Sequence, residues 1–368
     1  MINVALDVHV RNSFIKARNG SGDVLAQGRA GNTLLELSQK LAGVERAARD
    51  THQPVRAVLE ATGNSRAMAL LLERWGKEAE IDLTVDVLDA RKLQIIAQSV
   101  SKCDRLDAQV LLDLSASNLR LPICYLADSD EFALREHLRS RQDLVRVRTM
   151  VKNRIHAVLH RRGILRPAKL DLFAKAGRLF LAQAEIDQVG RKLLGDYLAV
   201  VDQMDQLLDD SERLLRQLSR SERWRRNAAI LESMPGVGLI TSLTILAELG
   251  DIDRFRGRDA VANYAGLVPV VRDSNAKTYR GGLVSHGNRP LRSVLIEAAW
   301  VAIARAPVYA ALYQRVESRR GAATAIVAVA RRLLEDAWTM LKKQEPFRYA
   351  RPLEAGVAAS AQAVMRLA

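Results

Sequence analysis

The chain has 368 residues, with 56 lysines and arginines against 42 aspartates and glutamates, so its formal net charge is +14. At about 150 residues a domain, this length predicts two or three domains. Apolar residues make up 48% of the chain, which excludes disorder as its main state. The positive charge favours a polyanionic partner, most simply a nucleic acid.

Three further features bear on where the protein works. No run of residues approaches the roughly 18 consecutive apolar residues of a membrane span, so we expect no membrane contact. The first ten residues lack a basic segment and read as a strand, which predicts that they are not a signal peptide. Cys103 and Cys124 are too few for a disulfide framework and indicate a reducing, cytoplasmic setting.

Residues 1–125 read as an α/β domain. Apolar runs predict strands, and helical spacing predicts a helix at 33–47, another at 65–77, and more from Ala90 onward. The turn sequence at 19–22, Asn-Gly-Ser-Gly, predicts a hairpin between the second and third strands. These elements predict a mixed sheet with helices packed on it. The predicted strands are 4–8, 13–17, 24–29, 55–60 and 81–88.

The rest of the chain predicts mostly helix. Residues 126–227 hold two long helical stretches, the second at 181–218, separated by 163–177, which predict an antiparallel pair or a basic coiled coil. Residues 228–350 predict a helical C-terminal domain with a loop-rich stretch at 267–287. Helices are predicted at 290–305 and 322–341, and the alanine-rich residues 351–368 are predicted to be a flexible tail.

Four carboxylates stand at positions suited to metal binding. Asp7 and Glu60 end apolar strands, and Asp104 and Asp107 are three residues apart, which places them on one face of a helix. Four clustered acids need cations to neutralise them, and carboxylates suit Mg²⁺ or Mn²⁺. Two such ions can drive phosphodiester chemistry. The alternative is that each acid is an ordinary surface charge or helix cap.

A second motif is Pro-Gly-Val-Gly at 235–238. A dinucleotide fingerprint needs a preceding strand, but here a helix precedes the glycines, so a helix-hairpin-helix fits better. Gly236 and Gly238 would then let backbone amides approach a phosphate. The alternative is an ordinary turn between helices.

A third motif is a serine among cations. Ser274 could attack a phosphodiester while neighbouring cations stabilise the developing charge. From the residues alone, a phosphate-binding loop is the favoured interpretation. The cations concerned are Arg272, Lys277, Arg280, Arg289 and Arg292.

The predicted helix at 135–162 carries nine lysines and arginines against two acids. This skew predicts contact with duplex DNA or structured RNA, whereas a solvated coiled-coil face usually carries mixed signs. The candidate contacts are Arg135, Arg139, Arg146, Arg148, Lys152, Arg154, Arg161 and Arg162.

Six ordered motifs together resemble the insertion-sequence 110 family of transposases, the DEDD recombinases that include the 1111 and 116 groups. The first three are A-L-D-V-H, L-E-A-T-G and K-C-D-R-L-D-A, and the last three are M-P-G-V-G-L-I-T-S, Y-A-G-L-V-P and S-H-G-N-R-P-L-R. The resemblance covers about 3–115 and 228–345. It implies a RuvC-like, RNase H-type nuclease domain followed by a transposase domain.

The resemblance also implies roles for particular residues. Asp7, Glu60, Asp104 and Asp107 would be the metal-binding acids, and Ser274 would form a phosphoserine link to DNA. Asn275 and Ala276 replace the glycines usual in the family, so Ser285 is the second candidate nucleophile. The family implies an element-encoded RNA that bridges donor and target DNA, assembly as dimers or tetramers, and work at the bacterial nucleoid.

Two alternatives stay open. A metal-dependent, structure-specific nuclease resembling a Holliday-junction resolvase would need the four acids but no serine. A basic nucleic-acid-binding scaffold would need neither, although all four acids are present in the chain.

Overall fold

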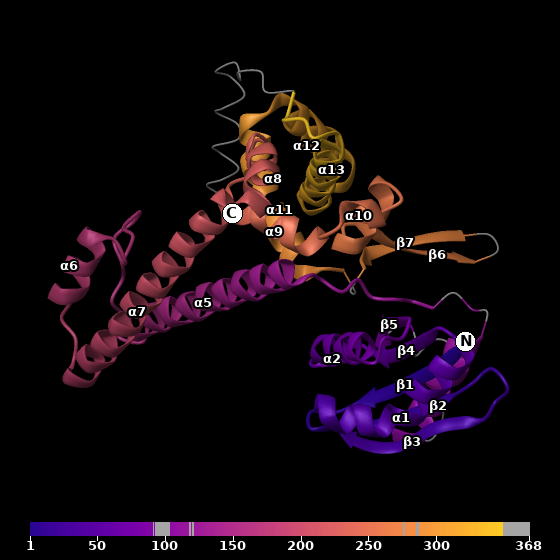
Figure 1. Cartoon of the computed structure of the whole chain (residues 1–368). Coiled ribbons are helices and arrows are strands. Elements are labelled where there is room, and N and C mark those ends of the chain that lie inside the picture. Colours follow the sequence, from indigo (N-terminus) through magenta and orange to yellow (C-terminus); the bar gives the residue numbers. More distant parts are fainter. Residues whose placement is uncertain are drawn as a thin grey trace. The chain divides into compact units, whose positions relative to one another are not determined.

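The computed structural model describes residues 1–90, 92, 104–117, 119, 121–274, 277–284 and 287–348. For residues 104–107 and 271–281 it describes no side chains, so Asp104, Asp107 and Ser274 are known through their backbone alone. Ser285 and the predicted tail lie outside the described residues. The chain divides into two compact units, Met1–Leu126 and Ala127–Ala368 (Figure 1).

The first unit is built on a five-stranded mixed sheet in the order β3-β2-β1-β4-β5. β1 pairs in parallel with β4 and β4 with β5, while β1, β2 and β3 form an antiparallel meander joined by the predicted hairpin. All five predicted strands are present. Their bounds are Ile2–Val8, Asn12–Arg18, Val24–Gly31, Val55–Glu60 and Leu83–Leu88.

Helices cover both faces of this sheet. α1 (Leu34–Thr51) and α2 (Ser65–Glu78) pack on the face formed by Val4, Leu6 and their neighbours. On the opposite face, α4 (Asp104–Ala116) buries leucines against Ala5 and Val58. Because successive side chains of a strand alternate between faces, these two clusters divide the strand residues between them.

One ion pair and one hydrogen bond join α4 to the sheet. Arg18 on β2 pairs with Asp113 on α4 at 2.9 Å. Arg56 on β4 pairs with Asp86 on the neighbouring strand β5, with both contacts at 2.8 Å, and its guanidinium also reaches the carbonyl of Ser115 on α4 at 3.4 Å. Asp86 is buried, at 8% exposed, so the Arg56 pair lies largely out of water. Together with the leucine contacts, the contacts of Asp113 and Ser115 fix which part of α4 lies over which strand residues.

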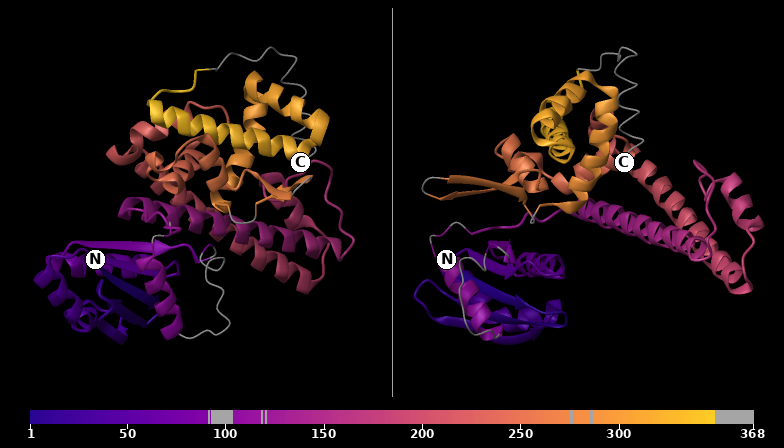
Figure 2. Two further views of the ribbon diagram at one scale, coloured as in Figure 1. Left: turned by 90° about the vertical axis from the view of Figure 1, so that its right-hand side faces the viewer. Right: turned by 180° about the vertical axis from the view of Figure 1, so that it is seen from behind.

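Two long helices begin the second unit. α5 (Ser129–His160) and α7 (Gln188–Arg220) pack side by side along much of their length (Figures 1 and 2). The predicted helical stretch at 181–218 is broken near its start, because α6 (Lys175–Gln183) includes its first three residues and α7 begins after an Asp187 cap. Hydrogen bonds from Arg162 and from the Gly190 amide lower the pKa of Asp187 to about 2. The antiparallel helix pair is present, and its description as a coiled coil stays a prediction.

The remaining helices of the second unit pack around one apolar core. Leu134 of α5 and Leu215 of α7 join this core, so the paired helices and the C-terminal helices share buried side chains. A boundary at 227/228 therefore stays a prediction. The helices are α8 (Glu222–Glu232), α9 (Leu239–Leu249), η1 (Ile252–Arg254), α10 (Arg258–Ala265), α11 (Arg289–Arg305), α12 (Pro307–Arg320) and α13 (Ala322–Lys343).

The stretch predicted to be loop-rich, 267–287, is largely a β-hairpin. β6 (Pro269–Ser274) pairs antiparallel with β7 (Lys277–Leu283), and the ribbon projects from the helices of its unit (Figure 1). The glycines at 281 and 282 suggested a loop, but they lie within β7, where strand pairing outweighs their low strand propensity. The short helices α10 and α12 also escaped prediction.

Among the described residues, no single helix is long and apolar enough to cross a membrane. Helices α11 and α12 reach that length and composition only as a pair bent by 108°.

The buried ion pair between β4 and β5, whose arginine also bonds to α4, can be tested by removing the arginine. Arg56→Ala leaves the buried Asp86 carboxylate without its guanidinium, so the free energy of unfolding of the first unit should fall by about 2–3 kcal/mol. Native-state hydrogen exchange of the β4 and β5 amides measures this loss. The matched control is Arg74→Ala, an exposed pair with Glu78, which should cost less than about 0.5 kcal/mol. Equal effects of the two substitutions would contradict the assigned role.

Candidate functional site

Asp7 and Glu60 lie next to each other at one edge of the sheet. Leu6 of β1 stands opposite Leu59 of β4 in a parallel pair, so the following residues, Asp7 and Glu60, are neighbours on adjacent strands. Asp7 lies two residues after Ala5, and Glu60 lies two residues after Val58. Both therefore lie on the sheet face that α4 covers. The structure therefore brings together the first two predicted acids.

The direction of α4 places its first turn near this acid pair. Leu111 and Leu112 pack on Ala5 and Val58, while Asp113 and Ser115 contact arginines toward the opposite end of the strands. The helix therefore runs against β1, and its N-terminal end lies toward Asp7 and Glu60. Positions 104 and 107 come one turn before the buried Ala108 and Leu111. The backbone of the second acid pair thus approaches the first, and their side chains lie outside the described residues.

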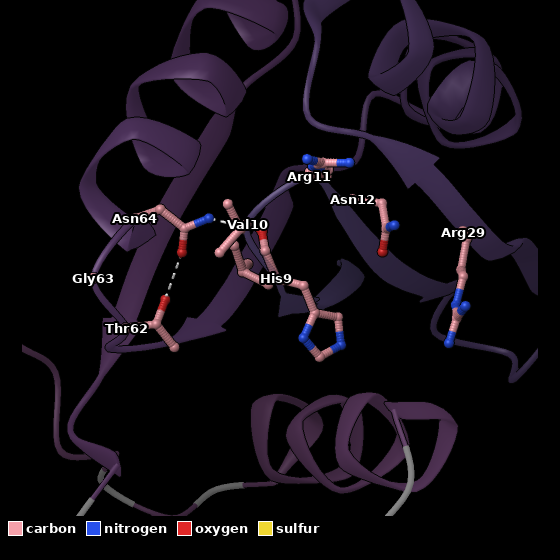
Figure 3. Close-up of a pocket in the computed structure, with 9 residues that line it drawn as sticks. His9, Val10, Arg11, Asn12, Arg29, Thr62, Gly63 and Asn64 are labelled. Carbon is pink, nitrogen blue, oxygen red and sulfur yellow. Dashed lines mark hydrogen bonds between the residues drawn. The ribbon is translucent and has the colours of Figure 1, made fainter.

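The end of β1 is held by side-chain amides. The carbonyl oxygen of His9 accepts hydrogen bonds from the amide of Asn32 at 2.8 Å and from that of Asn64 at 2.7 Å. Thr62 donates to Asn64 at 3.0 Å, as Figure 3 shows. These bonds fix the backbone two residues after Asp7. Sequence reasoning missed both asparagines, although each follows a strand at a predicted turn.

His9 contacts the Asp7 carboxylate. Its Nε2 lies 3.2 Å from Oδ2 of Asp7, whose side chain is 18% exposed against 47% for His9. Among the side chains that the structure describes, no three histidines, cysteines or acids form a metal-binding group. Two of the four proposed ligands are described, and their carboxylate oxygens are of the kind that divalent cations such as Mg²⁺ prefer. The described half of the site therefore has side chains of suitable chemistry for a divalent cation.

An open pocket of about 810 Å³ adjoins the end of β1. Arg11, Asn12 and Arg29 line it on one side, and Thr62 and Asn64 on the other (Figure 3). Two guanidinium groups and three polar side chains make the pocket cationic and rich in hydrogen-bonding groups. It lies beside the acids, so positive charge flanks the negative pair.

The candidate serine of the second unit lies at the tip of the hairpin. Ser274 is the last residue of β6 and stands opposite Lys277, the first residue of β7. Arg272 and Arg280 occupy the same two strands. The backbone thus presents a serine and three cationic positions on one narrow ribbon. The role of each side chain stays a prediction.

The segment after Ser285 is fixed by a close contact between two glycines. A Cβ on Gly287 would lie 2.3 Å from the Cα of Gly266, and Gly266 itself has a φ of +71°. Only glycine fits such an approach at both positions. Arg292 donates to the carbonyls of Gly266 at 3.3 Å and Val284 at 3.2 Å. The contact between Gly266 and Gly287 explains why two of the motifs contain glycine. The hydrogen bonds give Arg292 a structural role in addition to its predicted contact with a nucleic acid.

A buried carboxylate that sequence reasoning missed lies behind this segment. Glu248 of α9, whose side chain is 3% exposed, accepts three hydrogen bonds from Arg139 of α5, at 2.9 to 3.1 Å. Its other contacts include the amide of Asn288, at 2.7 Å, which caps α11. Arg135 donates to the carbonyl of Ala247 at 2.5 Å. The sequence signal that could have revealed Glu248 is a single acidic residue in the otherwise apolar helix α9.

Several other arginines of α5 pair with acids of α7. Arg148 donates to Asp205 at 2.7 Å, and Arg162 donates to Asp187. Lys152 lies over the ring of Phe173, with its nitrogen 4.5 Å from the ring centroid. These contacts balance part of the positive charge of α5 within the unit. At these positions they favour a helix pair with charges of both signs over a surface that contacts a nucleic acid.

The outer face of α5 differs from the face that contacts α7. Arg146, Arg154 and Arg161 line a hollow of about 620 Å³ together with apolar side chains that include Met150. Met150 is 53% exposed. Three of the predicted nucleic-acid contacts therefore gather on one exposed stripe of the helix.

The Pro-Gly-Val-Gly turn joins α8 to α9 as the sequence predicts. Gly236 has a φ of +86°, and a Cβ there would lie 2.3 Å from the carbonyl oxygen of Ala298 on α11. Gly238 faces open space. Gly236 is thus required by packing, and phosphate binding at the turn stays a prediction.

Comparisons with known proteins agree with this arrangement. A model of the IS116/IS110/IS902 transposase family matches residues 228–314, and a transposase model of the DEDD type of IS110 matches residues 4–162. The chain belongs to the IS110 family of transposases. The two matches cover the sheet with its acid pair and the helices that carry the glycine turn and the hairpin.

Curated relatives of this transposase are 26% to 29% identical to it over the aligned residues. The transposase of insertion sequence element IS1111A from Coxiella burnetii is 26% identical over 67% of this chain and 69% of its own length. An uncharacterized IS116 protein of Streptomyces clavuligerus is 29% identical over 44% of this chain and 40% of its own. The pilin gene-inverting protein of Moraxella bovis is 28% identical over 33% of this chain and 38% of its own. The chain thus spans less than half of the last two.

Removing the buried carboxylate tests what holds the segment after Ser285. Glu248→Ala leaves Arg139 and Asn288 without their acceptor, so the free energy of unfolding of the second unit should fall by about 2–3 kcal/mol. Glu248→Gln keeps an acceptor for Asn288 and should lose less. Urea denaturation measures the free energy of unfolding of both variants, and hydrogen exchange of the α9 and α11 amides shows where stability is lost. Asp143→Ala, which removes an exposed ion pair, is the control. An Ala variant as stable as the control would contradict the role of Glu248.

Proposed function

We propose that this transposase cuts and rejoins DNA strands with Mg²⁺ held by four acids and with a serine as nucleophile, guided by an element-encoded RNA. The observation that carries the proposal is the pairing of Asp7 with Glu60 on the sheet face over which α4 lies. The first turn of α4 brings positions 104 and 107 toward that pair. This arrangement supports a four-acid site within the first unit.

Asp7, Glu60, Asp104 and Asp107 would hold the metal. Divalent ions bound there would neutralise the acids and stabilise charge on the oxygens of a reacting phosphodiester. The chain's own contribution is to hold the ligands in position. Hydrogen bonds to the His9 carbonyl fix the end of β1. The ion pair of Arg18 with Asp113 and the hydrogen bond of Arg56 to Ser115 fix α4 on the sheet.

The pocket beside the acids would receive the DNA strand. A phosphodiester backbone that reaches the acid pair must continue on either side of it. Arg11 and Arg29 offer guanidinium groups to the neighbouring phosphates, and Asn12 and Thr62 offer hydrogen bonds. The cationic pocket thus favours approach of an anionic strand to an anionic site.

Ser274 would form the covalent link to the cut strand. Its Oγ would bond to phosphorus while the bond from phosphorus to the leaving deoxyribose oxygen breaks. The hydroxyl proton would leave Oγ, and the leaving oxygen would take up a proton to become a hydroxyl group. Reversal of the step by another strand's hydroxyl would rejoin the DNA. Cations on both strands of the hairpin support the choice of Ser274.

The guide RNA would lie along the basic surface of the second unit. The exposed stripe of α5, with Arg146, Arg154 and Arg161, supports backbone contact with a structured RNA. Assembly as a dimer or tetramer would let the acids of one subunit meet the hairpin of another. Membership of the family supports both the guide RNA and the oligomeric assembly.

The acid site is tested by Asp7→Asn. Loss of one carboxylate should reduce DNA strand cleavage by more than about 100-fold and weaken Mn²⁺ binding measured by calorimetry, because the ion loses a charged ligand. Glu60→Gln should behave alike. Asp50→Asn, an exposed acid on α1, is the control and should change neither quantity. Unchanged Mn²⁺ binding and cleavage in Asp7→Asn would contradict the proposal and favour a scaffold.

The serine is tested by trapping the covalent adduct. Ser274→Ala should abolish the protein–DNA adduct resolved on denaturing gels, while Mn²⁺ binding stays at the wild-type level because the acids are intact. Ser285→Ala is the matched variant and should retain the adduct. If the adduct is lost in Ser285→Ala and kept in Ser274→Ala, Ser285 is the nucleophile. Cleavage without an adduct in the wild type would favour the metal-dependent nuclease.

A further inference from the structure

A second cationic cavity lies in the second unit, where α7 ends and α8 and α9 begin. Its volume is about 340 Å³, near the lower end of the range for ligand sites of about 300–1,000 Å³. Arg216 and Arg220 enter it from the last two turns of α7, and Arg225 enters it from α8. Leu239, the first residue of α9, completes the wall beside the glycine turn.

The positive charge of this cavity is only partly balanced by the protein. Arg216 donates to Glu212 at 3.2 Å, and Glu232, the acid in the wall, accepts a hydrogen bond from Ser242 at 3.0 Å. In the part of the chain that the structure describes, Arg220 and Arg225 form no ion pair. The wall thus holds three guanidinium groups and one carboxylate, and one of the three, Arg216, is also paired with Glu212.

Two other arginines of the same helices are paired with acids. Arg213 of α7 pairs with Asp210, and Arg223 of α8 pairs with Asp128 at 2.5 Å. Helix stabilisation accounts for a cation at the end of α7, where the helix dipole is negative. It does not account for Arg225, which lies near the start of α8, where the dipole is positive. The arrangement therefore suits an anion from outside the protein.

We propose that this cavity binds the phosphodiester backbone of a nucleic acid. Arginine binds phosphate oxygens through paired hydrogen bonds, and three arginines around a small cavity suit one phosphate with its sugar. The strand would continue past Leu239 along the glycine turn, where Gly238 faces open space. The inference depends on the nucleic-acid binding in the proposed function and not on the strand chemistry.

The test compares two double variants of the full-length chain. Arg220→Ala with Arg225→Ala removes two guanidinium groups from the cavity. Arg213→Ala with Arg226→Ala removes the same charge from the same helices outside it. Fluorescence anisotropy measures the affinity of each for a 30-base-pair DNA duplex and for a structured RNA over a salt series. The thermal unfolding of each variant is recorded as the check on folding.

The cavity variant should bind more weakly by at least about tenfold, and its slope of log affinity against log salt should fall by about two. The control pair should keep a slope near that of the wild type. An effect on the RNA alone or on the DNA alone supports the site and names its ligand. Equal slopes for the two double variants would overturn it. A wild type that binds neither probe would instead contradict the proposed function.

A second variant keeps all the arginines. Ala229 lies in the cavity wall on the exposed side of α8, so Ala229→Glu adds a carboxylate there without burying it. It should weaken nucleic-acid binding by at least about tenfold, since like charges repel, while Ala229→Gln should bind near the wild-type level. If both substitutions weaken binding equally, the effect is steric and the electrostatic assignment is wrong.

Discussion

The parallel register of β1 with β4 is the constraint on which the proposed active site depends. It sets Asp7 beside Glu60, whereas a shift of one residue would turn one of them to the opposite face. The leucines of α4, the ion pair of Arg18 with Asp113 and the hydrogen bond of Arg56 to Ser115 then decide which end of the helix lies over the acids. Two carboxylates from the sheet and two from a helix can meet only if both constraints hold.

The second unit holds the segment of the two candidate serines on a helical scaffold. Glu248 accepts hydrogen bonds from α5 and from the cap of α11, so it ties the long helix pair to the segment that follows Ser285. The contact between Gly266 and Gly287 closes the same segment from the other side. The positive charge of the chain is accordingly of two kinds. Some arginines hold helices together, and others line open hollows in which a nucleic acid could bind.

Much of the fold follows from local sequence patterns. The five strands and the helix at 65–77 were predictable because apolar periodicity and turn residues agree there. The hairpin at 269–283 was not, because its glycines suggest a loop and strand pairing is a non-local effect. The acids at 7 and 60 were found through their places at strand ends. Glu248 and the asparagines at 32 and 64 were not, because their partners lie far away in sequence and become visible only in the folded chain.

Iron-directed cleavage of the protein backbone tests the four-acid site most directly. Fe²⁺ bound in place of Mg²⁺ generates hydroxyl radicals with ascorbate and peroxide, and these cut the chain close to the ion. The account predicts cuts near residues 7, 60 and 104–107 together, and their loss when Mg²⁺ is added in excess. Cuts confined to other segments, or cuts near 7 and 60 without any near 104–107, would contradict it.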